Sequence, residues 1–205
     1  METIFGSSVT YTGTFFSMLI LAIFLENTVF TRALGTSTVL LMLRKKANLL
    51  LFGVVLTLIT VIASVLAFWI NPLLADFPNK YYVTPIVYVL IISLVYVVAL
   101  IVVKRLLKRL AEELVPMIHL SAFNCAVFGA LLLANSYKMT LASTIGFGLG
   151  SGLGFTLAAL MLAISYNYLN SDNIPKAFRG FPITMIYVGI LSLAFYGLIG
   201  HQLPV

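Results

Sequence analysis

Residues 47–75 read ANLLLFGVVLTLITVIASVLAFWINPLLA and contain no Asp, Glu, Lys or Arg. A helix needs roughly 20 apolar residues to cross the hydrocarbon core of a bilayer, so this stretch predicts a transmembrane helix. Five further stretches also lack all four charged residue types: 3–25, 81–103, 114–137, 139–171 and 180–205. The sequence therefore predicts an all-α integral membrane protein with six transmembrane helices, near residues 10–33, 48–70, 83–103, 114–134, 141–167 and 181–200.

The composition supports the same class. The chain has 205 residues, of which 61% are apolar and only 9% are charged, and a water-soluble domain needs many more charged residues on its surface. The net charge of +6 would fit a nucleic-acid partner, but the basic residues form short clusters between apolar runs. We interpret these clusters as topology signals and expect no nucleic-acid partner. The loops are too short for a separate domain, so residues 1–205 are expected to form one membrane domain with halves 1–105 and 106–205.

The basic residues predict the orientation of the helices. Ten lie in or beside the loops after the first, third and fifth predicted helices: Arg32, Arg44, Lys45, Lys46, Lys104, Arg105, Lys108, Arg109, Lys176 and Arg179. The opposite side has only Lys80 and Lys138. Because cytoplasmic loops are enriched in Lys and Arg, we expect a multi-pass protein of the plasma or inner membrane with both termini on the non-cytoplasmic side. The segment Met1–Ile4 has no basic region, so no removable signal peptide is expected.

Three helices in each half predict an inverted 3+3 repeat, because an odd number of spans inverts the second half relative to the first. The sequence gives limited support at an offset of 97 residues, where Asn27, Ala33 and Leu34 match Asn124, Ala130 and Leu131. This interpretation therefore depends mainly on the predicted topology.

Glu26 and Asn27 lie late in the first predicted helix, where an unpaired carboxylate costs several kcal/mol. One interpretation is an ion or proton site. A second is a helix break, in which Asn27 satisfies freed backbone groups. A third is an ordinary ion pair between Glu26 and Arg32 near the membrane surface. The sequence alone leaves all three open.

Asn124 and Cys125 lie near the middle of the fourth predicted helix, and Cys125 is the only cysteine. Thiolate is a soft ligand that suits iron–sulfur clusters, although a lone buried cysteine is usually only a small apolar side chain. A cluster needs four ligands, so any cluster would have to be shared between chains. Asn124 is a further candidate for an ion site or helix break.

The five alternate glycines from Gly146 to Gly154 do not fit a dinucleotide-binding motif, because no strand precedes them. Their spacing instead gives two small-residue faces, 146/150/154 and 148/152, that favour close helix packing. His119 and His201 are too few and too far apart for a metal site. No sequence motif of a self-contained hydrolase or ATPase occurs, so the chain is expected to be at most a subunit of an enzyme.

Several segments carry a resemblance that covers nearly the whole chain. They are Ile174–Gly180 (IPKAFRG), Ser192–Gly197 (SLAFYG), Asn124–Gly129 (NCAVFG), and Glu26-Asn27 with Leu34-Gly35 and Arg44–Lys46. The sequence resembles the RnfA/NqrE family, six-helix subunits of the Rnf-type ion-translocating ferredoxin:NAD oxidoreductase and of the sodium-translocating NADH:quinone reductase.

The resemblance implies that this chain is a membrane subunit of an electron-transport complex with coupled ion movement. It implies an opposite-topology homologue and flavin-bearing subunits as partners. Two such homologues would each give two cysteines to one intramembrane 2Fe-2S cluster, and Cys125 matches the second ligand position of the family.

Three positions depart from the family pattern. Ser37 stands where the family has its other cysteine, Leu100 where it has a glutamate, and His119 where it has a proline. A serine hydroxyl is a hard ligand and far less acidic than a thiol. The alternative prediction is therefore a diverged, redox-inactive protein that acts as a transporter or scaffold.

Overall fold

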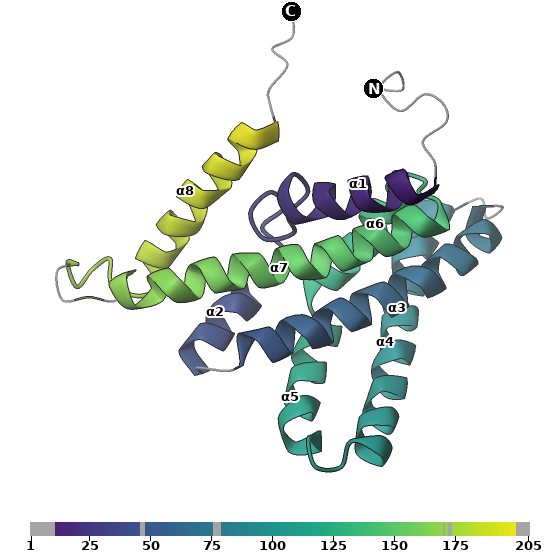
Figure 1. Ribbon diagram of the computed structural model, residues 1–205, viewed down its shortest axis with the longest axis horizontal. Coiled ribbons are helices and arrows are strands. Elements are labelled where there is room, and N and C mark those ends of the chain that lie inside the picture. Colours follow the sequence, from purple (N-terminus) through teal and green to yellow (C-terminus); the bar gives the residue numbers. More distant parts are fainter. Residues whose placement is uncertain (1–10, 46–47, 76–78, 170, 172–173, 200–205) are drawn as a thin grey trace, which may run out of the picture.

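The computed structural model describes residues 11–45, 48–75, 79–169, 171 and 174–199 (Figure 1). These residues form eight helices and no strand: α1 Tyr11–Phe24, α2 Thr36–Lys45, α3 Leu49–Ala75, α4 Lys80–Leu106, α5 Ala111–Ala122, α6 Cys125–Ser136, α7 Leu141–Leu169 and α8 Phe181–Ile199. The prediction of an all-α fold is confirmed.

Several helices are suited to a bilayer. Three are long and apolar enough to cross it, over Leu49–Leu74, Lys80–Leu106 and Leu141–Tyr166. The pair α5 and α6 passes the same test together, although the two helices are bent by 48° at a short break. Two shorter apolar helices, Phe15–Phe24 and Phe181–Gly197, lie near the two ends of the chain. A multi-pass membrane protein follows from these helices, while the count of six spans stays a prediction.

Two of the six predicted helices are interrupted. The prediction that the first helix continues to residue 33 is wrong, because α1 ends at Phe24 and α2 begins only at Thr36. Between them Ala33 and Gly35 have φ angles of 55° and 77°, and a right-handed helix cannot contain such angles. The predicted helix 114–134 is likewise broken, at Phe123 and Asn124.

Helix α7 is the centre of the packing, and α1 lies along one side of it (Figure 1). A Cβ atom at Gly150 would lie 2.5 Å from the carbonyl oxygen of Leu19, and Cβ atoms at Gly146 and Gly154 would also press on carbonyl oxygens of α1. The glycines therefore allow the two helices to touch backbone to backbone, as small residues do in membrane helix pairs.

The other glycine face of α7 packs on α3. A Cβ at Gly152 would lie 2.6 Å from the Cα atom of Thr57, and one at Gly148 would lie 3.4 Å from the Cα atom of Val61. The two small-residue faces predicted from sequence thus serve two different neighbours, and the packing interpretation of the glycine run is confirmed.

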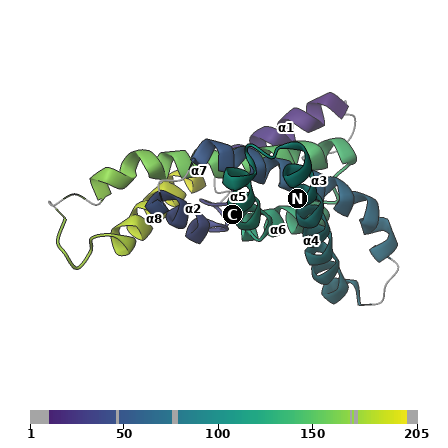
Figure 2. The ribbon, with the colours of Figure 1, turned by 90° about the horizontal axis from the view of Figure 1, so that it is seen from below.

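Helix α8 projects away from the other helices (Figures 1 and 2). It is joined to them by few side chains: the rings of Phe195 and Phe30 are 4.7 Å apart, and Ser165 Oγ and Tyr187 Oη are 2.6 Å apart. Large apolar side chains on its other faces are exposed, such as Leu193 at 73%. Lipid or another chain must cover them, since water would be unfavourable there.

The glycine packing predicts a contrast between two alanine substitutions. Gly150→Ala should lower the free energy of unfolding in detergent by about 1–3 kcal/mol, because the added methyl collides with the α1 backbone. Gly189→Ala is the matched control, since a Cβ there meets nothing within 4 Å, and it should be neutral or slightly stabilising. Denaturant titration of the purified chain measures both, and equal losses would contradict the packing described here.

Candidate functional site

The two broken helices meet at Gly35 and Cys125. The backbone N–H of Gly35, just before α2, donates a hydrogen bond of 2.9 Å to Cys125 Sγ at the start of α6. Gly35 has no room for a side chain: a Cβ would lie 2.5 Å from Phe155 Cε2 and 2.7 Å from Asn124 Oδ1. Its φ of 77° also favours glycine. The fold therefore brings two segments 90 residues apart in the sequence into close contact.

Asn27 holds the first break together. Its Oδ1 accepts hydrogen bonds from the backbone N–H groups of Val29 (3.0 Å) and Phe30 (3.1 Å). Its Nδ2 donates to the carbonyl oxygens of Ile23 (2.8 Å) and of Gly154 on α7 (3.0 Å). The side chain is fully buried. These contacts fit the helix-break interpretation of Asn27, because this amide satisfies backbone groups that the break leaves free.

Asn124 closes the second break in a similar way. It is the N-cap of α6, and its Oδ1 accepts a 3.0 Å hydrogen bond from the N–H of Ala126, two residues later. Asn27 uses its Oδ1 in the same way toward Val29. The Nδ2 of Asn124 has no hydrogen-bond partner in the described part of this chain, although it is buried. A buried donor beside the cysteine is thus left available.

The two candidate ligand residues are both exposed. Cys125 is exposed at the start of α6, and Ser37 is exposed in the first turn of α2, two residues after the glycine that contacts Cys125. Ser37 also borders a small cavity of about 320 Å³ beside Phe181 and Thr184. Among the described residues, no three His, Cys, Asp or Glu side chains gather as a metal site would require. This chain alone therefore offers one thiolate.

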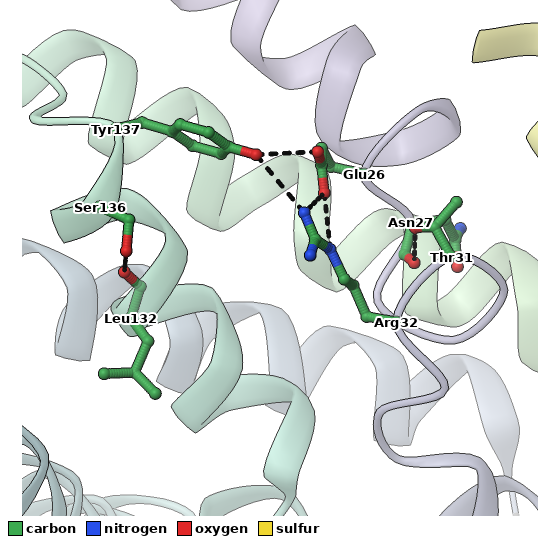
Figure 3. A network of polar contacts seen from close by, with 7 residues as sticks. All are labelled: Glu26, Asn27, Thr31, Arg32, Leu132, Ser136 and Tyr137. Atoms are coloured by element: carbon green, nitrogen blue, oxygen red, sulfur yellow. Dashed lines mark hydrogen bonds and ion pairs between the residues drawn. The ribbon is translucent and has the colours of Figure 1, made fainter. Parts of the chain in front are cut away.

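Glu26 is the carboxylate of a compact polar cluster (Figure 3). Its Oε2 accepts hydrogen bonds from Arg32 Nη2 (2.7 Å) and Nε (2.9 Å). Its Oε1 accepts one from the Tyr137 hydroxyl (2.9 Å). The predicted ion pair with Arg32 is confirmed, and both carboxylate oxygens are engaged. Sequence reasoning missed Tyr137, because nothing in the sequence pairs residues that lie so far apart.

This cluster also involves Arg32. The guanidinium lies 3.5 Å from the hydroxyl of Tyr137, which directly precedes Lys138 in the sequence. In the predicted topology, Arg32 and Lys138 lie on opposite sides of the membrane. Arg32 has a local partner in Glu26, and the orientation of the helices stays a prediction.

A second polar pair lies between α4 and α5. Tyr96 Oη is 2.7 Å from His119 Nδ1, and the Tyr96 ring also contacts Phe123, with 5.1 Å between centroids. His119 is exposed, and Phe123, directly before Asn124, is 67% exposed. His119 is thus hydrogen-bonded within the chain, as an interior histidine is, but its ring reaches the outer face of the helices.

Two buried hydroxyl groups near the breaks have no hydrogen-bond partner among the described residues: Thr28 Oγ1 and Ser121 Oγ. Thr28 follows Asn27, and Ser121 lies three residues before Asn124. Buried polar atoms are normally paired, so both breaks retain polar groups that this part of the chain does not satisfy by itself.

Comparison with known proteins identifies relatives along nearly the whole chain. A family model described as an Rnf-Nqr subunit, membrane protein, matches residues 15–201. A subunit of the Na(+)-translocating ferredoxin:NAD(+) oxidoreductase complex of Acetobacterium woodii is 30% identical over 186 residues, covering 91% of this chain and 97% of that relative. A subunit of the ion-translocating oxidoreductase complex of Syntrophotalea carbinolica is 31% identical over 183 residues, covering 89% and 95%.

The two asparagines should differ in their effect on stability. Asn27→Ala removes the acceptor of two buried N–H groups, so we expect it to lower the free energy of unfolding by about 2–4 kcal/mol. Asn124→Ala removes a single helix cap and should cost about 1 kcal/mol. Unfolding titrations of the purified protein in mixed micelles measure both changes. Asn124→Ser, which keeps a capping oxygen without adding a charge, is the control, and an Asn27→Ala variant as stable as the parent would contradict the role described for Asn27.

Proposed function

The chain belongs to the Rnf-Nqr family of membrane subunits, and on that premise we propose that it passes electrons across the bilayer within an ion-translocating electron-transport complex. Its relatives are named as subunits of ion-translocating oxidoreductase complexes, and the chain covers nearly their full length. The observation that carries the proposal is the exposed Cys125, held by the Gly35 N–H where the two broken helices meet.

Cys125 would be this chain's thiolate ligand to a 2Fe-2S cluster shared with a homologous partner of opposite topology. The surroundings of the sulfur fit this role. Hydrogen bonds to cluster sulfurs tune the reduction potential, and the Gly35 N–H already donates to Sγ. The Nδ2 of Asn124, which has no partner among the residues that the structure describes, is a second donor next to Cys125 in the sequence. When bound, the cluster would supply a one-electron redox centre.

Exposure of the ligand positions supports a shared site. A cluster needs four ligands, and a partner can reach Cys125 and Ser37 only because both lie at the surface of this chain. Ser37 would stand at the second ligand position, where its hydroxyl binds iron more weakly than a thiolate. The partner would supply the remaining ligands, and flavin-bearing subunits would exchange electrons on the two sides.

The pair formed by half-buried Tyr96 and exposed His119 gives separate support for a partner on this surface. His119 lies within the bent span formed by α5 and α6, and Tyr96 lies near the middle of α4. Hydrocarbon offers no hydrogen bonds to an imidazole ring. A second membrane protein packed against α4 and α5 would cover this pair and keep it away from lipid.

The proposed arrangement has six spans, with both termini on the non-cytoplasmic side. The direction of the packed helices supports it. Along α1, Phe15 and Leu19 meet Gly146 and Gly150 of α7 in the same order, so these helices run parallel. Along α3 the order is reversed, so α3 runs antiparallel to α7. These are the directions expected if α1 belongs to the first span, α3 to the second and α7 to the fifth.

The same structural features support an inverted repeat. The two broken helices occupy corresponding places in the two halves, and each break is closed by an asparagine whose Oδ1 accepts the N–H group two residues later. Asn27 and Asn124 are the pair that the sequence offset of 97 residues aligns. Repeats of this kind place functional groups at discontinuous helices near the middle of the bilayer.

The cluster proposal predicts that one substitution removes the 2Fe-2S signal and that another makes the bound iron harder to remove. In the anaerobically purified complex, Cys125→Ala should abolish the 2Fe-2S signal in EPR after reduction, with a parallel loss of iron and acid-labile sulfide. Ser37→Cys should keep the signal and slow the loss of iron to chelators, because thiolate binds iron more tightly than a hydroxyl. Thr38→Cys is the matched control and should have no effect. A parent complex without any 2Fe-2S signal would refute the proposal.

A second candidate function is a redox-inactive transporter or scaffold, and the serine at position 37 favours it. This alternative predicts that Cys125→Ala leaves ion transport intact, while Glu26→Gln impairs it. The electron-transfer proposal predicts the opposite: Cys125→Ala impairs ion transport, while Glu26→Gln leaves it largely intact. Under that proposal Glu26→Gln only weakens a partly exposed ion pair, a change of about 1 kcal/mol or less in stability. Ion uptake into vesicles containing each variant separates the two functions.

A further inference from the structure

A cavity of about 650 Å³ lies between α3, α4, α6 and the start of α7. Its volume is in the range of small-molecule sites, and it is separate from the helix breaks. The residues that line it come from the C-terminal part of α3, the first turns of α4, the end of α6 and the loop to α7. The cavity thus lies at one end of these helices, where a membrane span meets the head-group region.

Two lysines line this cavity, Lys80 and Lys138, and no acidic residue is found among the lining residues that the structure describes. In the predicted topology, they are the two basic residues on the side of the membrane opposite the main basic clusters. Lysines are less frequent in loops on the non-cytoplasmic side than in cytoplasmic loops. The two lysines come from segments far apart in the sequence, and the fold brings both to one cavity. A ligand in this cavity could therefore contact both.

The helix ends add to the positive potential. Helix α4 begins at Lys80 itself, and α7 begins at Leu141, two residues after the lining residue Met139. The N-terminus of a helix carries a partial positive charge. The cavity thus has two lysines and two helix N-termini around it, and no carboxylate among its described lining residues. This arrangement of charge favours an anion.

The rest of the lining is partly polar and partly apolar. Hydroxyl and amide groups are contributed by Ser64, Asn71 and Asn135, and apolar walls by Phe68 and Leu132. Outside the cavity the same end of α3 exposes Trp69 and Leu73 by 66% and 69%. A free inorganic anion needs no such apolar wall, whereas an amphiphile with an anionic head group matches both parts of the lining.

We propose that this cavity binds an anionic phospholipid. Lys80 and Lys138 pair with the phosphate, the hydroxyl and amide groups hydrogen-bond to the head group, and the acyl chains lie along the wall at Phe68 and Leu132. This site is independent of the cluster at Cys125, so it stands or fails separately from the proposed function.

The test is native mass spectrometry of the purified full-length chain titrated with phosphatidylglycerol or with phosphatidylcholine of the same acyl chains. The parent should bind phosphatidylglycerol more tightly by about 10- to 30-fold, as expected for two lysines near a lipid phosphate. The double variant Lys80→Gln/Lys138→Gln should lose this preference. The control Lys104→Gln/Lys108→Gln removes the same charge at exposed positions away from the cavity and should keep it.

Two further measurements distinguish a lipid site from a free-anion site and from unspecific charge attraction. Leu132→Trp, which fills the apolar wall but keeps both lysines, should also weaken phosphatidylglycerol binding while leaving the unfolding midpoint near that of the parent. Equal losses in the two lysine double variants would show unspecific charge attraction and overturn the proposal. So would displacement of the lipid by millimolar inorganic phosphate, which would mean that the cavity selects a free anion.

Discussion

A break in a transmembrane helix frees backbone N–H and C=O groups in a place where water is scarce, and the whole centre of this protein is arranged around that cost. An unpaired group in hydrocarbon costs several kcal/mol. Asn27 removes much of the cost at the first break with four hydrogen bonds. Asn124 caps the helix that begins after the second break. Once the backbone is satisfied elsewhere, the Gly35 N–H remains available for the sulfur of Cys125.

The glycines of α7 belong to the same arrangement. Asn27 can donate to the carbonyl oxygen of Gly154 only because α1 and α7 approach at backbone distance, and the absence of side chains at Gly150 and Gly154 permits that approach. On the opposite face, Gly152 lets α3 come equally close. The first break is therefore held against α7. Because Gly35 lies in this break and contacts Cys125, close packing positions the cysteine and no flexible loop is required.

The sequence predicts the features that arise from composition and local pattern. Long uncharged runs locate the main helices, and the glycine spacing identifies both packing faces of α7. The pattern also singles out Asn27 as a residue able to support a break, because an amide in an apolar span needs partners. It places the first helix through residue 33, since apolar residues such as Val29 and Phe30 continue past the break and hydropathy does not register a change of φ.

Local sequence patterns do not predict contacts between distant segments. Tyr137 on Glu26 and Gly35 on Cys125 join residues 111 and 90 positions apart, and no local pattern encodes such a pairing. The ion pair of Glu26 with Arg32 is foreseeable because it spans only six residues. The Tyr137 hydroxyl on the same carboxylate is not foreseeable, because it comes from a distant segment.

Leu100 and His119, where the resemblance implies a glutamate and a proline, lie on neighbouring helices and are best understood together. Leu100 is half-buried and packs against the apolar core. One turn earlier on the same helix, Tyr96 hydrogen-bonds to His119. A carboxylate in a span requires a counter-charge or a proton, whereas a tyrosine hydroxyl and an imidazole ring hydrogen-bond to each other. The α4–α5 surface thus has a polar contact without a carboxylate, and a partner can cover it without having to supply a cation.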